Sequence, residues 1–161
     1  PGGMLRYGIP DFRLPHDVLA QEIDVVRILG GEFRLRSRLG VDFTLADLRR
    51  DFDAVFLAIG AQQSRGLDCP GEKLALPAVD VLARVARGTP PSLGDDVVVV
   101  GGGNTAMDAA RTAVRLGART VSVLYRRTRR EMPRAASSVR PNQWWACSRF
   151  RSCCATGTTR H

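Results

Sequence analysis

The sequence predicts an α/β fold, and its clearest part is a parallel β-α-β unit in the C-terminal half of the chain. Residues 97–100 are four consecutive valines, which is typical of a central strand of a parallel sheet, buried on both faces. Three glycines and an amphipathic helix follow directly. Alternating apolar residues at 121–125 then predict a second strand.

The first 60 residues predict a separate set of elements. Residues 15–29 have apolar side chains near helical spacing and predict an amphipathic helix. Apolar and charged residues alternate over 32–36, which predicts a half-exposed strand. Thr44 is a candidate N-cap for a short helix through about Arg50, because its hydroxyl can accept an amide hydrogen at the helix start. Residues 54–60 predict a buried strand that ends at a glycine.

Residues 61–94 predict a connection between two domains, because glycines and prolines are frequent there and surround one apolar helical stretch at 79–85. The later helix is expected to begin at Asn104 and to stop at Gly117. Its expected buried residues are Ala106, Met107, Ala110, Ala113 and Val114.

Residues 101–106 read Gly-Gly-Gly-Asn-Thr-Ala and fit the pattern G-x-G-x-x-A, directly after a strand and at the start of a helix. Gly101 allows the tight turn, Gly103 lets a pyrophosphate approach the backbone, and Ala106 permits close packing of helix on strand. Free amide groups and the positive end of the helix dipole then face the phosphates. The sequence therefore predicts a nucleotide site on a Rossmann-like unit, and the alternative is a plain glycine turn.

The position that selects between the two nicotinamide nucleotides carries arginine. NAD-specific folds place an acid about 20 residues after the glycines, where it binds the ribose 2′-hydroxyl. Here Arg126 and Arg127 stand at that distance, with Arg129 and Arg130 close behind. Guanidinium groups offer forked, permanently charged donors that suit a 2′-phosphate. NADPH is therefore the predicted ligand, and the alternative is a solvated arginine run.

Four blocks follow one another along the chain: GMLRYGIPDF at 3–12, AVFLAIGA at 54–61, VGGGNTAMDAAR at 100–111 and YRRTRREMP at 125–133. Together they resemble the small, NADPH-oxidising subunit of glutamate synthase. The same order also resembles the corresponding region of dihydropyrimidine dehydrogenase and related NADPH flavoproteins. The resemblance covers about residues 2–133.

The resemblance implies a flavoprotein in which an NADPH-binding domain is inserted into a split FAD-binding domain. Residues 1–60 are then part of the FAD-binding domain, 61–94 connect the two, and 95–133 are part of the NADPH-binding domain. NADPH is expected to pass a hydride to FAD, and electrons to go on to iron–sulfur clusters or a partner such as a large subunit. The cofactors carry such chemistry, so no catalytic acid–base pair is expected.

By the same resemblance, the first FAD-binding glycine fingerprint and a cysteine-rich cluster segment are expected outside these residues, and so is the returning part of the FAD-binding domain. This chain alone is expected to hold FAD poorly. The alternative to an oxidoreductase is therefore a catalytically incompetent NADPH-binding fragment.

The resemblance also assigns cofactor-binding residues. The loop at 5–10 is expected near the flavin ring, and residues 58–60 are expected where the chain leaves the FAD-binding domain near the cofactor. The residues assigned to FAD are Leu5, Arg6, Gly8, Ile9, Pro10, Ala58, Ile59 and Gly60. Those assigned to NADPH are Gly101, Gly103, Asn104, Thr105, Ala106, Arg126 and Arg127.

Simpler interpretations exist for several residues of these blocks. Asn104 and Thr105 are also suited to helix capping, and Glu131 to surface solvation. Asp108 and Arg111 can form a salt pair along their helix. A single histidine at a helix start, such as His16, is more often structural than catalytic.

The net charge of +8 comes from the end of the chain. Residues 1–125 carry 15 basic and 15 acidic side chains, whereas 126–161 carry nine arginines and one glutamate. A basic face spread over the fold is not predicted, and a nucleic-acid-binding function would depend on the tail alone. The sequence therefore predicts no nucleic-acid partner.

Several other classes of protein have no support in the sequence. There is no Cys-x-x-Cys pair, so neither a thiol redox centre nor a zinc site is predicted. No signal sequence or membrane span is found, so a cytoplasmic protein without a membrane partner is expected. Residues 134–161 show neither helical nor strand periodicity and are expected to be a disordered tail. Its origin is either a wrong-frame or truncated gene end or a true C-terminal extension.

Overall fold

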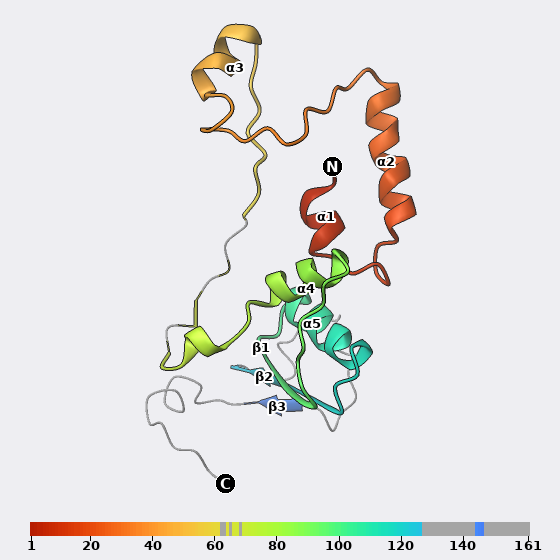
Figure 1. Ribbon diagram of the computed structural model, residues 1–161, viewed down its shortest axis with the longest axis vertical. Coiled ribbons are helices and arrows are strands. Elements are labelled where there is room, and N and C mark those ends of the chain that lie inside the picture. Colours follow the sequence, from red (N-terminus) through yellow and green to blue (C-terminus); the bar gives the residue numbers. More distant parts are fainter. Residues whose placement is uncertain (62–63, 65, 68, 127–143, 147–161) are drawn as a thin grey trace.

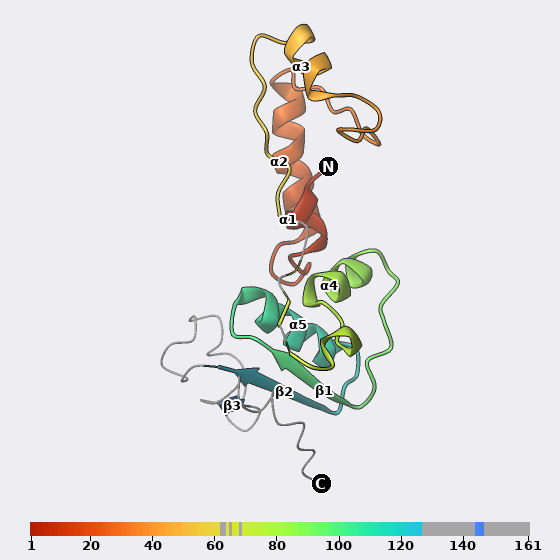
Figure 2. The same ribbon diagram turned by 90° about the vertical axis from the view of Figure 1, so that its left-hand side faces the viewer.

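A computed structural model describes residues 1–61, 64, 66–67, 69–126 and 144–146. The elements in chain order are α1 (Gly3–Tyr7), α2 (His16–Ile28), α3 (Leu45–Asp51), η1 (Glu72–Leu74), α4 (Ala78–Ala86), β1 (Asp96–Val100), α5 (Asn104–Arg115), β2 (Thr120–Tyr125) and β3 (Trp144–Ala146). In Figures 1 and 2 the sheet, α4 and α5 lie together, and α3 lies at the far end of the molecule. The predicted α/β class is confirmed.

The sheet is built around the predicted β-α-β unit. β1 and β2 are parallel, with Val97 opposite Val121 and Val99 opposite Val123, and α5 connects them. β3 pairs with β2 in the same direction, so the strand order is β1-β2-β3. The sequence did not predict β3, because three residues are too few to show a period. The remaining predictions for 134–161 lie outside the described residues.

The core lies between this sheet and α5. Met107 of α5 and Val123 of β2 are fully buried in it, and Val99 of β1 packs there as well. Side chains of a strand alternate between its two faces. Val98 therefore points to the other face of β1, where it is 64% exposed.

β1 was predicted to be a central strand buried on both faces, and within the described sheet this is wrong. β1 pairs only with β2 there and forms an edge. Four valines make both faces of a strand apolar. Whether a second strand pairs with the free edge of β1, or another layer covers its outer face, depends on distant parts of the fold. Composition alone does not specify those parts.

The residues that α5 buries differ from the prediction at several positions. Ala106, Met107, Ala110 and Ala113 are buried as predicted, whereas Val114 is half-exposed. Ala109 is also buried, as part of the core cluster. Asp108 is buried because α4 and an N-terminal segment pack against α5. After α5, Gly117 adopts a φ of 97°, a conformation that favours glycine at helix ends.

The predicted helices of the first 60 residues and of the connection are confirmed. α2 covers most of the predicted 15–29, and α4 contains the apolar stretch at 79–85. α3 begins with a capping box in which the Asp47 amide donates to the Thr44 hydroxyl oxygen at 3.2 Å and the Thr44 amide donates to the Asp47 carboxylate at 3.0 Å.

The two strands predicted in the first 60 residues are not formed. Residues 32–36 and 54–60 have no regular secondary structure, and Phe56 is 92% exposed. A strand needs a neighbour for its backbone hydrogen bonds. None of the described strands lies beside either segment, so the apolar pattern is present without the pairing that would bury it.

Within the described residues, no helix is both long enough and apolar enough to cross a membrane.

Candidate dinucleotide-binding site

The turn after β1 has a backbone that only glycine adopts readily. Gly101 has a φ of 132°, and its amide donates to the Leu124 carbonyl at 2.9 Å, which ties the turn to the end of β2. A side chain on Gly101 would place its Cβ 3.3 Å from the Cβ of Ala106. The turn is therefore tight, and a small residue at 106 lets α5 begin directly above the strand ends.

The middle glycine is required by an aromatic ring. A Cβ on Gly102 would lie 2.5 Å from two ring carbons of Tyr125, the last residue of β2. The G-x-G-x-x-A pattern leaves position 102 free and therefore predicts no role for Gly102. The signal available was the third glycine itself, which the pattern does not explain.

The third glycine faces open space. Gly103 is exposed and extended, with φ −79° and ψ 175°, and a Cβ on it would meet no protein atom within 4 Å. Neither backbone conformation nor packing within the described residues explains a glycine here. This position fits a ligand that approaches the backbone closely.

The start of α5 presents amide groups at the same place. The helix has 12 residues, no side chain caps its first turn, and that turn contains no acidic residue. Asn104 and Thr105 are exposed and do not act as caps, because Gly103 occupies the cap position. The uncapped amides and the helix dipole together form an anion-binding surface.

Arg126 lies at the same edge of the sheet. It is exposed and directly follows β2, two residues after Leu124, which pairs with Val100. Both strand arrows point to this edge in Figure 2. Among the described residues, no carboxylate lies at this end of β2, where an NAD-specific fold would place one. Arg127, Arg129, Arg130 and Glu131 lie outside the part of the chain that the structure describes.

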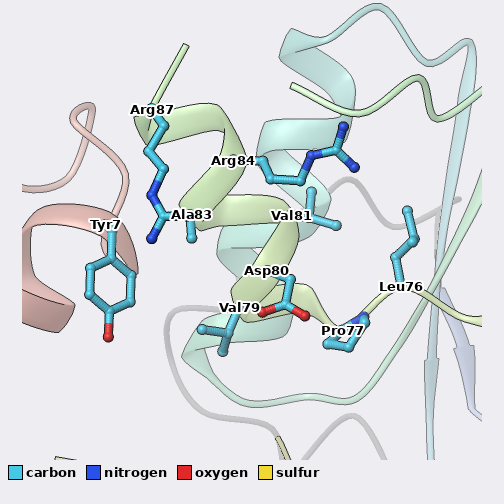
Figure 3. A pocket seen from close by; sticks show the side chains of 9 residues that line it. All are labelled: Tyr7, Leu76, Pro77, Val79, Asp80, Val81, Ala83, Arg84 and Arg87. Carbon is cyan, nitrogen blue, oxygen red and sulfur yellow. The ribbon is translucent and has the colours of Figure 1, made fainter. Parts of the chain in front are cut away.

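Two cavities lie away from this turn. One, of about 520 Å³, lies between α1 and α4. Its two arginines, Arg84 and Arg87, extend in different directions and do not converge on one ligand (Figure 3). The other, of about 230 Å³, lies between residues 10–16 and the helices α4 and α5. Neither is lined by residues 101–106. Ligands of open α/β sheets bind outside the strand ends, so we place the candidate site at the turn.

The residues assigned to FAD by resemblance lie in two separate places. Gly8 is buried at the end of α1, where its amide donates to the Met4 carbonyl at 2.8 Å, while Leu5 is half-exposed. Ile59 is largely exposed in the extended segment at 54–60. Neither cavity described above is lined by residues of both places.

The simpler interpretation of His16 is supported. Its Nε2 atom lies 3.2 Å from the Arg6 carbonyl oxygen, and its backbone amide donates to the Asp11 carboxylate at 3.0 Å. These contacts fix the chain locally. Among the described residues, no group of three or more His, Cys, Asp or Glu side chains is placed to hold a metal ion.

Residues 19–141 match the pyridine nucleotide-disulphide oxidoreductase family. The chain is 49% identical over 144 residues to the NADP(+)-dependent formate dehydrogenase subunit beta of Moorella thermoacetica, which covers 86% of this chain and 20% of that protein. It is 42% identical to the NADPH-Fe(3+) oxidoreductase subunit beta of Geobacter sulfurreducens, over 82% of this chain and 20% of that protein.

The glutamate synthase [NADPH] small chain of Escherichia coli is 39% identical, over 86% of this chain and 32% of that protein. The resemblance to the glutamate synthase small subunit is therefore confirmed. The chain spans between a fifth and a third of the length of these three relatives.

Proposed function

The chain belongs to the pyridine nucleotide-disulphide oxidoreductase family, and on that premise we propose that it is the NADPH-binding part of a flavoprotein oxidoreductase. FAD, if bound, would supply the hydride and electron chemistry that links NADPH to iron–sulfur clusters or a partner subunit. The residues of this chain bind and orient the nucleotide, and none acts as a catalytic acid or base.

The open position at Gly103 carries this proposal. Gly101 and Gly102 are required by the fold, through a positive φ and a tyrosine ring. Gly103 is not, and it lies in front of the uncapped start of α5. A pyrophosphate at this place would accept hydrogen bonds from the amides of Asn104, Thr105 and Ala106.

Arg126 and Arg127 are proposed to hold the 2′-phosphate of NADPH. Arg126 is exposed at the edge where the turn lies, so its guanidinium can reach a nucleotide bound there. A hydrogen bond to a charged group contributes roughly 1.5–3 kcal/mol, which corresponds to about a 10- to 100-fold change in affinity. The names of the relatives above, which specify NADP(+) or NADPH, support the same nucleotide.

FAD is proposed to contact two apolar surfaces of the N-terminal part. Leu5 and Ile59 are both exposed, and an exposed apolar side chain suits contact with the flat flavin ring. We assign Leu5, Arg6, Gly8, Ile9 and Pro10 to one surface. Ala58, Ile59 and Gly60 are assigned to the other.

A partner protein is part of the proposal. Three relatives are named as a beta subunit or a small chain, which implies that they assemble with other subunits. An iron–sulfur protein or a large subunit is the proposed electron acceptor. Neither nucleic acid nor membrane is among the proposed partners.

The second candidate is an NADPH-binding chain that transfers no hydride. The extended, exposed residues 54–60 favour it, because they leave one of the two FAD surfaces without regular secondary structure. Visible flavin absorbance of the purified chain separates the candidates. Retained flavin supports the oxidoreductase, and NADPH binding without flavin supports the second candidate.

The test of NADPH binding is a calorimetric titration of the chain and of Arg126→Ala with NADPH and with NADH. We expect the variant to lose about 10- to 100-fold in NADPH affinity and to keep its NADH affinity, because only NADPH carries the 2′-phosphate. Arg119→Ala is the matched control, since Arg119 precedes β2 at its opposite end and pairs with Asp96 at 3.0 Å.

Equal losses for both nucleotides would remove the 2′-phosphate assignment. Absence of NADPH binding by a folded wild-type chain would overturn the proposed function itself.

A further inference from the structure

Residues 10–16 form a hydrogen-bonded turn that leads from α1 into α2. The Pro10 carbonyl accepts hydrogen bonds from the amides of Arg13 at 2.9 Å and Leu14 at 3.1 Å. The Asp11 carboxylate accepts from the amide of His16, the first residue of α2, at 3.0 Å. This turn directly follows Gly8 and Ile9, and it contacts α5.

The first contact is a partly buried ion pair between residues far apart in the sequence. Arg13 Nη1 donates to Asp108 Oδ2 at 2.7 Å, and the Asp108 residue is only 2% exposed. Arg111, on the same helix, lies farther away, with its Nη1 3.6 Å from Asp108 Oδ1. The predicted salt pair along the helix therefore exists, but the shorter contact of Asp108 is with the N-terminal turn.

The second contact is a cation–π pair. The Arg115 guanidinium carbon lies 3.8 Å from the centre of the Phe12 ring. Asp108, Thr112 and Arg115 are four and three residues apart, so they lie on one face of α5. This face is opposite the one through which Ala106, Ala110 and Ala113 contact the sheet.

That outer face would ordinarily be in water, yet Asp108 and Thr112 are both buried. Apolar packing alone does not explain how the turn is held there. The cavity of about 230 Å³ lies in this same interface and is lined by Phe12 and Thr112 among others. Since the interface is not filled, its directional contacts set the orientation of the turn.

We propose that Asp108 is a positioning residue: with Arg115, it holds residues 10–16 against α5 and so fixes the loop at 5–10 relative to the dinucleotide-binding turn. α5 begins at that turn, and Asp108 lies one helical turn further on. The helix therefore connects the proposed NADPH site rigidly to the segment proposed to contact FAD. This inference rests on the proposed function, because it concerns the distance between the two cofactors.

Hydride transfer requires close and accurate alignment, and a displacement of about 1 Å can cost roughly 100-fold in rate. Arg13→Ala removes the ion pair by changing its partly exposed partner, and Arg111 remains 3.6 Å from the buried Asp108 carboxylate to offset part of its charge. We expect it to reduce the rate of flavin reduction by NADPH about 10- to 100-fold in the FAD-loaded protein, measured in a single turnover. NADPH affinity should stay within about twofold, because Arg13 does not contact the nucleotide site.

Arg13→Lys should recover most of the rate, because a lysine ammonium can still donate to Asp108. Asp108→Asn is the complementary variant, and loss of folding there would not affect the test on Arg13. Arg27→Ala is the control, since Arg27 pairs with Asp24 on the exposed side of α2 at 2.7 Å. It should leave the rate unchanged.

Amide hydrogen exchange tests the contact without any cofactor. Arg13→Ala should raise exchange at residues 11–16 and leave β2 unchanged. Unchanged exchange at 11–16 overturns the inference, as does flavin reduction at the wild-type rate in Arg13→Ala. A folded wild-type protein that does not bind NADPH, in contrast, overturns the proposed function, and the positioning role falls with it.

Discussion

Two apolar segments of this chain, both predicted to be strands, differ in burial and in strand pairing. In β2, Val123 is fully buried and its strand pairs with both neighbours. At 54–60, Phe56 is 92% exposed and the segment pairs with no described strand. Residues 54–60 are more apolar than β2, which contains Thr120 and Ser122, so composition does not account for the difference.

What differs is the distance to a partner. The register of β1 and β2 joins Asp96 to Thr120, and the helix between them covers the resulting face. Such a unit completes its own hydrogen bonds and its own core within a short stretch of chain. Residues 54–60 have no equivalent neighbour in sequence. An apolar run alone therefore does not form a strand, because the partner that pairs with it and buries it has to come from another part of the chain.

The largest expected effect tests this contrast directly. Met107→Ala should lower the free energy of unfolding by about 2–5 kcal/mol, because it leaves a cavity at a fully buried site between α5 and the sheet. Phe56→Ala should change it by less than about 0.5 kcal/mol, because the ring is in water. Denaturant unfolding measures both. A large loss for Phe56→Ala would mean that 54–60 is paired after all.

A second contrast concerns two adjacent glycines. Gly102→Ala should destabilise the fold by about 1–3 kcal/mol, because its Cβ would overlap the Tyr125 ring. Gly103→Ala should leave stability almost unchanged, since its Cβ meets nothing and its φ of −79° suits alanine. We expect Gly103→Ala instead to weaken NADPH binding. Thermal unfolding and calorimetric titration of both variants separate the two effects.

The reverse pattern would contradict these assignments. If Gly103→Ala binds NADPH with unchanged affinity, the open space in front of α5 is not where a pyrophosphate lies. Tyr125→Ala should relieve the destabilisation caused by Gly102→Ala, because the three atoms nearest to the added Cβ all belong to that ring.

The sequence predicted elements whose signals are local. The cap at Thr44, the stop at Gly117 and the glycine turn at 101–106 each depend on a few neighbouring residues, and each is present. The pairing of β1 with β2 was also predictable, because only α5 separates them. The predicted burial of Val114 was wrong, and the burial of Asp108 was not predicted, because the Arg13 side chain that contacts it comes from a distant part of the sequence.

Features of the site that join distant residues could not be predicted. The Tyr125 ring against Gly102 and the Arg13–Asp108 pair link residues 23 and 95 positions apart, and no single-sequence pattern encodes such contacts. The same reason explains the two missing strands. The assigned cofactor roles at 5–10, 58–60, 101–106, Arg126 and Arg127 stay predictions until nucleotide binding is measured.

The smallest expected effect lies in α3, which carries its own stabilisation far from the sheet. The side chain and then the backbone amide of Thr44 donate to Asp47 and hold the pKa of its carboxyl below the usual value, and Arg50 contributes less. A lowered pKa means that the ionised form stabilises the helix above the ordinary aspartate pKa. That contribution is lost as the pH falls through the lowered value.

Backbone chemical shifts of α3 should therefore move toward those of unfolded chain in acid, before those of α5 do. Asp47→Asn should remove the pH dependence, because an amide does not ionise, while its oxygen can still accept from the Thr44 amide. If α3 has the same acid titration in the wild-type chain and in Asp47→Asn, the capping box does not stabilise this helix. α3 would then depend on contacts with the rest of the chain, and the contrast between a locally completed β-α-β unit and a dependent N-terminal part would become sharper.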